Sequence, residues 1–154
     1  MKLWKSDEPD LRFTHDKEIL RGISNKPSNA LIYYIGNYPP NDVLTRVDRY
    51  MKSLKPPNSM WDAVLNTGNP KEPASGWAST GFATRYMEYL VNNDDAYAEG
   101  LHTKARALVR PIYIGHHSSD KNYSPASVCI NVIEELVELP IEREDTGGVV
   151  TYRG

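Results

Sequence analysis

Two apolar-rich runs lie close together near the N-terminus, and the polar residues between them predict a β-hairpin. The runs are residues 18–24 and 30–36, and the turn-forming residues 25–29 join them. Loops of this length and composition connect antiparallel strands. In the second run, residues 31–35 are apolar at consecutive positions, which is typical of a strand that is covered on both faces. We therefore expect a hairpin whose second strand is central in a sheet.

Three later segments have apolar residues at the three- and four-residue spacing of amphipathic helices. They are residues 42–54, 81–91 and 126–139. The first follows Asn41, a candidate cap, and its apolar stripe is the clearest in the chain. The third follows Ser124 and Pro125, the common arrangement of a capping residue with proline at the first helical position. We expect a helix in each segment.

The remaining segments give weaker patterns. Residues 60–65 predict a short helix after Ser59, and residues 112–115 predict a short strand. Residues 94–109 fit either a helix or a strand, and their length and alanine content favour a helix. Residues 66–79 are rich in glycine and proline and predict a loop, which is long enough to be functional.

Together these elements predict an α+β fold. A small mixed or antiparallel sheet, with the N-terminal hairpin and residues 112–115, would be covered by about three amphipathic helices. We expect residues 1–17 to form an extended arm, 18–139 a single α+β domain, and 140–154 a C-terminal hairpin or tail. The expected core residues are Leu31, Ile35, Val47, Met51, Phe82, Leu90, Val132 and Ile133.

Composition limits the classes of function. The chain has 154 residues, and its 18 basic and 20 acidic residues give a net charge of −2 and a pI near 6.1. A uniform cationic field that would attract nucleic acid is therefore absent. No apolar run is long enough for a membrane span, and the charged N-terminus does not resemble a secretory signal. The single Cys129 cannot form a disulfide within the chain and favours a reducing compartment or a redox-indifferent particle.

One pair of motifs resembles the signature of GIY-YIG nucleases. Gly22-Ile23-Ser24 is followed, after nine residues, by Tyr34-Ile35-Gly36, and Ser24 stands where the family has tyrosine. The resemblance implies phosphodiester hydrolysis, in which Glu88 binds a divalent cation such as Mg²⁺. An arginine, Arg46 or Arg49, would stabilise the phosphate and Tyr34 would orient water. A second triplet, Tyr113-Ile114-Gly115, occurs later in the chain.

A second set of motifs resembles phage head-to-tail neck and minor tail proteins. The set comprises Thr67-Gly68-Asn69, Tyr97-Ala98-Glu99-Gly100 and residues 105–111. The resemblance implies a non-enzymatic subunit of a virus particle near the head-tail junction, located in the virion or in the host cytoplasm. Its partners would be copies of itself and other particle subunits, and it would need no cofactor. This is our first functional hypothesis, and the nuclease is the alternative.

Several residues are candidates for contacts in such an assembly. Aromatic residues are frequent at the centres of interfaces, and basic residues bind acidic partners or packaged DNA. His102, Arg106 and Arg110 recur every four positions and form a basic stripe. The interface candidates are Trp4, Phe13, Trp77, Arg106, Arg110 and Tyr152.

Two other chemistries are disfavoured. His116 and His117 are adjacent, so their side chains diverge, and no Cys or His pair has the spacing of a zinc site. Cys129 lies on the apolar stripe of its predicted helix, where a cysteine is usually a core residue. We therefore expect no metal ligand under the first hypothesis and only Glu88 under the second.

Overall fold

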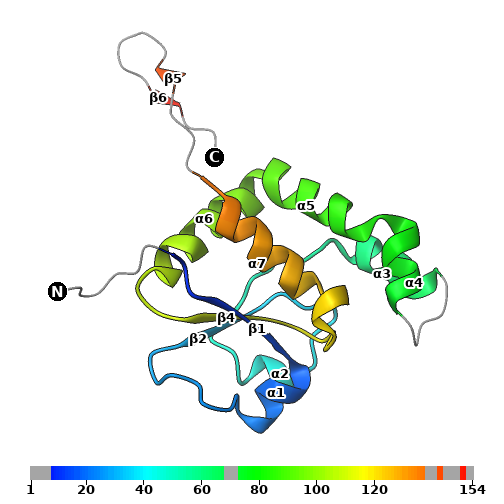
Figure 1. The fold of residues 1–154 in the computed structure, drawn as a ribbon, viewed down its shortest axis with the longest axis horizontal. Helices are drawn as coiled ribbons and strands as arrows, with labels where there is room; N and C mark the ends of the chain where they lie inside the picture. The colour runs from blue at the N-terminus through cyan, green and yellow to red at the C-terminus, as the bar shows by residue number, and fades with distance from the viewer. Residues whose placement is uncertain (1–7, 68–72, 138–141, 144–149, 152–154) are drawn as a thin grey trace.

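A four-stranded parallel sheet forms the centre of the computed structural model, which describes residues 8–67, 73–137, 142–143 and 150–151. The strands are β1 (Leu11–His15), β2 (Leu31–Tyr34), β3 (Arg49–Tyr50) and β4 (Ile112–His116). Their order in the sheet is β1-β4-β2-β3, and all three pairings are parallel (Figure 1). The fold is therefore of the α/β class, and the predicted α+β fold with a mixed or antiparallel sheet is wrong.

The predicted N-terminal hairpin is also wrong. Its first half contains the helix α1 (Asp16–Arg21), which ends at Gly22 with a positive φ of 81°. Its second half is β2, which lies between β4 and β3 rather than beside an antiparallel partner. The consecutive apolar residues of β2 are explained by the parallel sheet, because such sheets are covered by helices on both faces.

Helices cover the two faces of the sheet (Figure 1). The remaining helices are α2 (Asn41–Leu44), α3 (Asn58–Asn66), α4 (Pro73–Thr80), α5 (Phe82–Asn92), α6 (Asp94–Ala107), the 3-10 helix η1 (Lys121–Tyr123) and α7 (Pro125–Glu135). One face packs against α1 and α2, and we call it the α1/α2 face. The other packs against α6 and α7, on which α5 packs in turn, and we call it the α5–α7 face.

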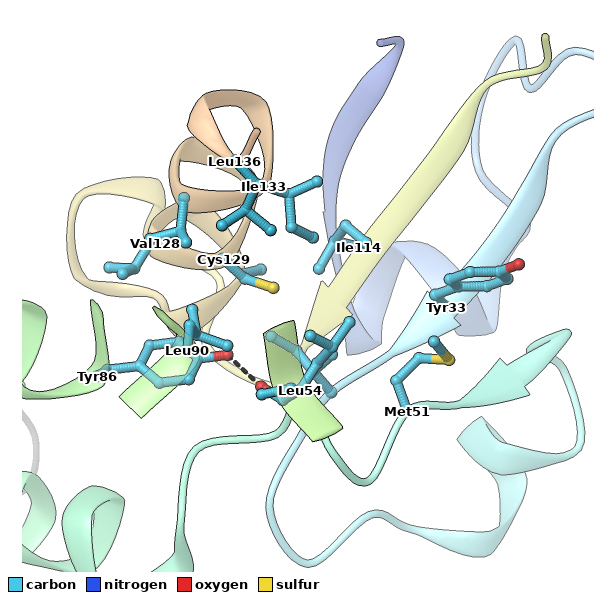
Figure 2. Packing of buried hydrophobic residues seen from close by; sticks show 14 of the residues in the cluster. Tyr33, Met51, Leu54, Tyr86, Leu90, Ile114, Val128, Cys129, Ile133 and Leu136 are labelled. Atoms are coloured by element: carbon cyan, nitrogen blue, oxygen red, sulfur yellow. Dashed lines mark hydrogen bonds between the residues drawn. The ribbon is translucent and has the colours of Figure 1, made fainter. Parts of the chain in front are cut away.

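Alternate strand residues supply the two cores. Ile32, Tyr34 and Tyr113 belong to a smaller cluster on the α1/α2 face, together with Ile19 of α1. Their sequence neighbours point the other way and belong to a larger cluster on the α5–α7 face. In that cluster Ile114 packs near Cys129, Ile133 and Leu90 (Figure 2). Of the predicted core, Leu31 and Val47 are partly buried and the other six residues are buried.

The clearest predicted helix, residues 42–54, ends at Leu44. The chain then forms β3, and Asp48 accepts a hydrogen bond from the backbone N–H of Ile32 through Oδ2 at 2.7 Å. The apolar residues of this segment are divided between the two cores, since Val43 packs on the α1/α2 face and Met51 and Leu54 on the other. The apolar residues that look like one helical stripe in the sequence thus pack on two opposite faces of the sheet.

The other helix predictions are confirmed. α5 lies where expected, α7 begins where expected but ends at Glu135 rather than at residue 139, and the ambiguous residues 94–109 form the helix α6 as far as Ala107. The Ser124 side chain caps α7 by accepting from the N–H of Ala126 at 3.2 Å, and Asn93 caps α6 by accepting from that of Ala96 at 3.0 Å. The short helix at 60–65 lies within α3.

The predicted loop at 66–79 is wrong in part, because α4 occupies its second half. Gly76 lies where α4 crosses α3, and a Cβ there would overlap the carbonyl oxygen of Val64. The glycine that favoured a loop instead permits close packing of two helices. Within the described ranges, the structure contains no helix long and apolar enough to span a membrane.

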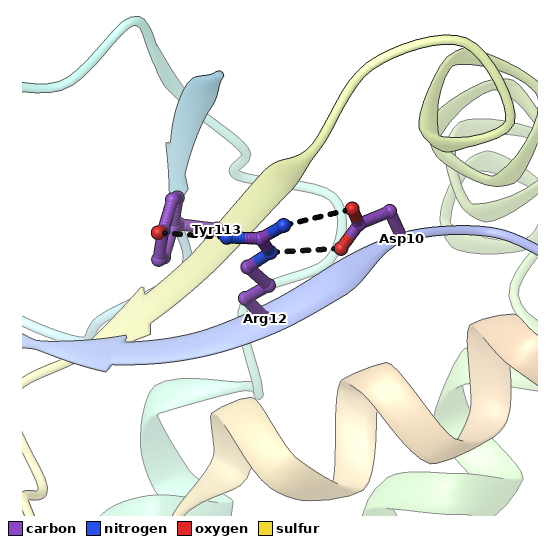
Figure 3. Close-up of polar contacts among 3 residues, drawn as sticks. All are labelled: Asp10, Arg12 and Tyr113. Atoms are coloured by element: carbon purple, nitrogen blue, oxygen red, sulfur yellow. Dashed lines mark hydrogen bonds and ion pairs between the residues drawn. The ribbon is translucent and has the colours of Figure 1, made fainter. Parts of the chain in front are cut away.

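The ends of the chain differ partly from expectation. Residues 11–15 of the predicted arm are the edge strand β1, and Arg12 anchors it to β4 (Figure 3). The Arg12 guanidinium donates to both carboxylate oxygens of Asp10, at 2.8 and 3.0 Å, and to the hydroxyl of Tyr113 at 3.3 Å. Near the other end, β5 (Glu142–Arg143) pairs with β6 (Val150–Thr151) in an antiparallel arrangement.

Candidate functional site

The strand order places a topological switch point at the carboxyl ends of β1 and β4. These strands are neighbours, with His15 in register with His116. The chain leaves β1 into α1 on one face and leaves β4 toward α7 on the other face. In open α/β sheets, ligands bind where the connections of adjacent strands diverge in this way. The geometry of the fold thus marks this edge as the candidate site.

Polar side chains gather at the same edge. His15 and Asp16 lie at the end of β1, Asn37 follows β2, and His116 and His117 lie at the end of β4. Together with Tyr34 they form what we call the carboxyl-edge cluster. His15 belongs to it by position, and its Nδ1 is a buried atom without a hydrogen-bond partner in the structure.

Tyr34 reaches Asp16 across the α1/α2 face. Its hydroxyl donates to Oδ1 of Asp16 at 2.5 Å, and its side chain is fully buried. Burial and the hydrogen bond to the carboxylate raise the pKa of Tyr34, so the phenol is protonated at all physiological pH values. Tyr34 therefore acts as a fixed donor that orients the Asp16 carboxylate.

Two glycines make room for the Tyr34 ring. A Cβ at Gly36 would lie 2.5 Å from the outer atoms of the ring, and a Cβ at Gly115 would lie 3.3 Å from its Cδ1. Gly36 comes just after the end of β2, and Gly115 is the register partner of Tyr34 on β4. The two Tyr-Ile-Gly triplets of the sequence are staggered in the sheet, so that only Tyr34 and Gly115 are register partners, and both glycines border the Tyr34 ring.

His116 is fully buried and held as a neutral imidazole. Its Nδ1 accepts from the backbone N–H of Ser118 at 3.1 Å, which assigns the ring proton to Nε2. Nε2 faces Oδ1 of Asn37 at 3.4 Å, and the Asn37 amide is fixed because its Nδ2 donates to the carbonyl of Pro56 and to Oδ1 of Asn58. Burial, together with the neighbouring His117, holds the pKa of His116 well below its ordinary value.

His117 differs from His116 because it borders open space. Its Nε2 accepts from the indole N–H of Trp61 at 3.0 Å, so the proton of the neutral ring is on Nδ1. Burial lowers the pKa of His117, and the negative charge of Asp16 opposes this effect in part. His117 is therefore a neutral imidazole near pH 7 that has a carboxylate within electrostatic range.

A cleft of about 370 Å³ opens beside His117. It is lined by Trp61, Leu65, His117, Ser118, Ser119, Asp120 and Tyr123. Most of these residues belong to the connection between β4 and α7, which begins at the switch point. Its volume lies at the lower end of the range for small-molecule pockets. The cleft offers an imidazole, two serines and a carboxylate to a bound molecule.

The residues that the nuclease hypothesis requires do not meet in one cleft. Tyr34 belongs to the α1/α2 face, whereas Glu88 is exposed on α5, which covers the other face. Arg46 is exposed and donates to the carbonyl of Asp42 at 3.0 Å. Arg49 lies 3.9 Å from Glu99 and over the ring of Tyr33. In the part of the chain that the structure describes, no three His, Cys, Asp or Glu residues are grouped as a metal site.

Four of the interface candidates make contacts within the chain. Phe13 packs against the larger core and Trp77 packs against Phe82 and Tyr123, at ring distances of 4.8 and 5.9 Å. Arg106 donates to the hydroxyl of Tyr33 at 2.7 Å, and Arg110 donates to the carbonyl of Asn29 at 2.6 Å. Trp4 and Tyr152 lie outside the described residues.

The sequence contains a signal for the carboxyl-edge cluster, of which the motif resemblances include only Tyr34. In a parallel sheet all strands end at the same edge, so a polar residue directly after each apolar run predicts a shared site. Asp16, Asn37 and His117 stand at such positions, but an expected antiparallel sheet would place them at different edges. The chain gives no significant match to a protein-family model, a curated protein or a solved structure.

Proposed function

We propose that the chain is an enzyme that binds a small polar molecule at the carboxyl edge of its sheet and uses His117 to transfer a proton. The observation that carries the proposal is the position of His117. This histidine lines a cleft at the point where the connections of β1 and β4 diverge, and burial lowers its pKa. A neutral imidazole near pH 7 is the form that acts as a general base.

Asp16 supports this role. Its negative charge stabilises the imidazolium that forms when His117 takes a proton, and Tyr34 fixes one oxygen of the carboxylate. Trp61 holds the ring by donating to Nε2, the nitrogen with the free lone pair, so His117 takes a proton only when this hydrogen bond opens or the ring turns, and Nδ1–H is a donor to the bound molecule. The Ser118 and Ser119 side chains line the cleft, and the Ser118 hydroxyl, which donates to the carbonyl of Tyr123 at 3.1 Å, can accept a hydrogen bond from a substrate.

A ligand screen tests the proposal and also identifies the chemical class of the substrate. A panel of nucleosides, nucleotides, sugars, sugar phosphates, amino acids and carboxylic acids would be screened by saturation-transfer NMR against the wild type, His117→Gln and His102→Gln. His102 is exposed on α6 and is the matched control. We expect one chemical class to bind the wild type and His102→Gln, and to lose at least tenfold in affinity with His117→Gln.

A second step tests catalysis. Compounds of the binding class would be incubated with wild type and with His117→Gln, and their turnover followed by NMR as a function of pH. The rate should fall at low pH as His117 becomes protonated, and should be lost in His117→Gln. Equal binding by His117→Gln, or a panel in which no class binds, would argue against the proposal.

The two hypotheses from sequence motifs stay predictions. A particle subunit would form a discrete oligomer, which light scattering at several concentrations measures. A GIY-YIG-like nuclease would nick plasmid DNA in the presence of Mg²⁺ and lose this activity with Glu88→Ala. Neither result bears on the binding of small molecules at His117, so the three functions are tested separately.

A further inference from the structure

The helices α5 and α7 form an apolar groove on the surface of the helical layer. The groove has a volume of about 470 Å³. Val132 of α7 and Leu136, which directly follows α7, form its floor and are also part of the larger core. Met87 and Val91 of α5 border it, and these two side chains are 44% and 42% exposed. Large apolar side chains that line a concave surface are typical of binding sites rather than of ordinary solvated surface.

The shape of the groove fits a helix. Its lining residues on α5 are Thr84, Met87, Glu88 and Val91, which occupy one side of the helix over two turns. This length is about 10 Å at the rise of an α-helix. A third helix laid between α5 and α7 would insert apolar side chains at positions i, i+3 or i+4, and i+7, which is the usual pattern of helix-in-groove recognition.

The charge of the groove indicates which helix would bind. Glu88 and Glu135 stand one on each helix, both exposed, and the groove has no basic residue among its described lining side chains. Asp94 and Asp95, in the first turn of α6 just after α5, are also exposed and acidic. A ligand helix with lysines or arginines beside its apolar stripe would complement these carboxylates.

A second copy of the same groove is a poor occupant. In a two-fold dimer the same patch faces itself, so the acidic rims that contain Glu88 and Glu135 would face each other. Like charges placed together across an interface disfavour binding. The charge pattern therefore favours a different protein over a copy of this chain.

We propose that the α5/α7 groove binds a basic amphipathic helix of a partner protein. This site is separate from the carboxyl-edge cluster and does not depend on the enzymatic proposal. The bound helix would bury Met87 and Val91 under its apolar stripe and place its basic residues beside Glu88 and Glu135. The interaction would weaken with added salt, because the charged rims stay close to solvent.

The test uses two fluorescein-labelled 18-residue peptides on the full chain. Both repeat leucine at i, i+3 and i+7; one has lysine and the other glutamate at the flanking positions. Fluorescence anisotropy would give each dissociation constant in 50 mM and 300 mM NaCl. We expect the wild type to bind the lysine peptide at least tenfold more tightly than the glutamate peptide, and the E88K/E135K double variant to reverse this order.

Val91→Ser and Val109→Ser form a matched pair of variants. Both valines are exposed, but Val109 follows α6 and does not line the groove. Val91→Ser should weaken binding of the lysine peptide at least fivefold and Val109→Ser should leave it unchanged, while circular dichroism checks that both fold. Equal effects of the two variants, absence of binding to the wild type, or a dimer that Val91→Ser dissociates in sedimentation would overturn the proposal.

Discussion

The hydroxyl of Tyr34 donates a 2.5 Å hydrogen bond to Oδ1 of Asp16 and so connects the end of β2 to the first turn of α1. β4 lies between β2 and β1 in the sheet, so this contact passes over the end of β4, where Gly115 has no side chain. The hydrogen bond depends on Gly36 and Gly115, which leave space for the ring. Several measurable consequences come from this arrangement and from the histidines beside it.

Tyr34→Phe should lower the free energy of unfolding by about 1.5–3 kcal/mol, the usual contribution of a hydrogen bond to a charged group. Urea denaturation followed by circular dichroism measures the change. Tyr50→Phe is the control, because the Tyr50 hydroxyl donates to a neutral acceptor, the carbonyl of Gly36, at 3.0 Å. Its expected cost is only about 1 kcal/mol. A Tyr34→Phe loss no greater than that of Tyr50→Phe would contradict the prediction.

Gly36→Ala should destabilise the fold by about 1–3 kcal/mol, because the new methyl group would force the buried Tyr34 ring from its place. The same substitution in a Tyr34→Leu background should cost less, since the outer ring atoms are gone. A double-mutant cycle by urea denaturation measures this coupling. Additive effects of the two substitutions would show that the ring and Gly36 do not compete for space.

The buried histidines predict a loss of stability in mild acid. In the unfolded chain His116 and His117 take up protons as the pH falls through about 6.5, whereas in the folded chain their lowered pKa values keep them neutral. The unfolded state then binds more protons, so the free energy of unfolding falls with decreasing pH below about 6.5. Each such proton contributes about 1.4 kcal/mol per pH unit at most.

Urea denaturation between pH 7.5 and 5 measures this slope. His116→Gln should reduce it, whatever its effect on stability at pH 7.5, because one of the two linked protons is removed. His102→Gln changes a histidine that is exposed on α6 and is the control substitution. An unchanged slope in His116→Gln would show that His116 is not held neutral.

Asp16→Asn should lower the pKa of His117 further, because the negative charge that opposes the effect of burial is removed. NMR titration of the imidazole C–H signals measures the value. Asp42→Asn, which removes an exposed carboxylate on α2, is the control and should not shift this signal. A pKa that stays the same or rises in Asp16→Asn would mean that Asp16 does not act on His117.

Cys129 should be inert in the folded protein. It is completely buried, and burial raises its pKa to about 12, so the reactive thiolate is scarce at neutral pH. Ellman's reagent should label it at the rate of global unfolding in native buffer and at once in 6 M guanidinium chloride. Rapid labelling of the native protein would show that α7 opens locally.

The helices and strands that the sequence predicts differ from the observed ones where one apolar pattern is compatible with two different structures. Ser124 with Pro125 and the apolar spacing of α5 were sufficient to place two helices, since caps and periodicity are local properties. The stripe in residues 42–54 was misleading, because Val43 and Met51 are buried against opposite faces of the sheet. An apolar residue in the sequence predicts that its side chain is buried. It does not predict which face of the sheet the side chain packs against.

The candidate site depends on tertiary structure even more than the individual helices and strands do. The sequence by itself determined the position of Cys129 in a core, the central strand at 31–35 and the polar residues that follow the strands. Only the parallel order β1-β4-β2-β3 brought Asp16, Tyr34 and His117 together, because parallel strands all end at one edge. Strand order is set by contacts between residues that are far apart in the chain, such as Leu11 and Ile112, and local periodicity does not contain that information.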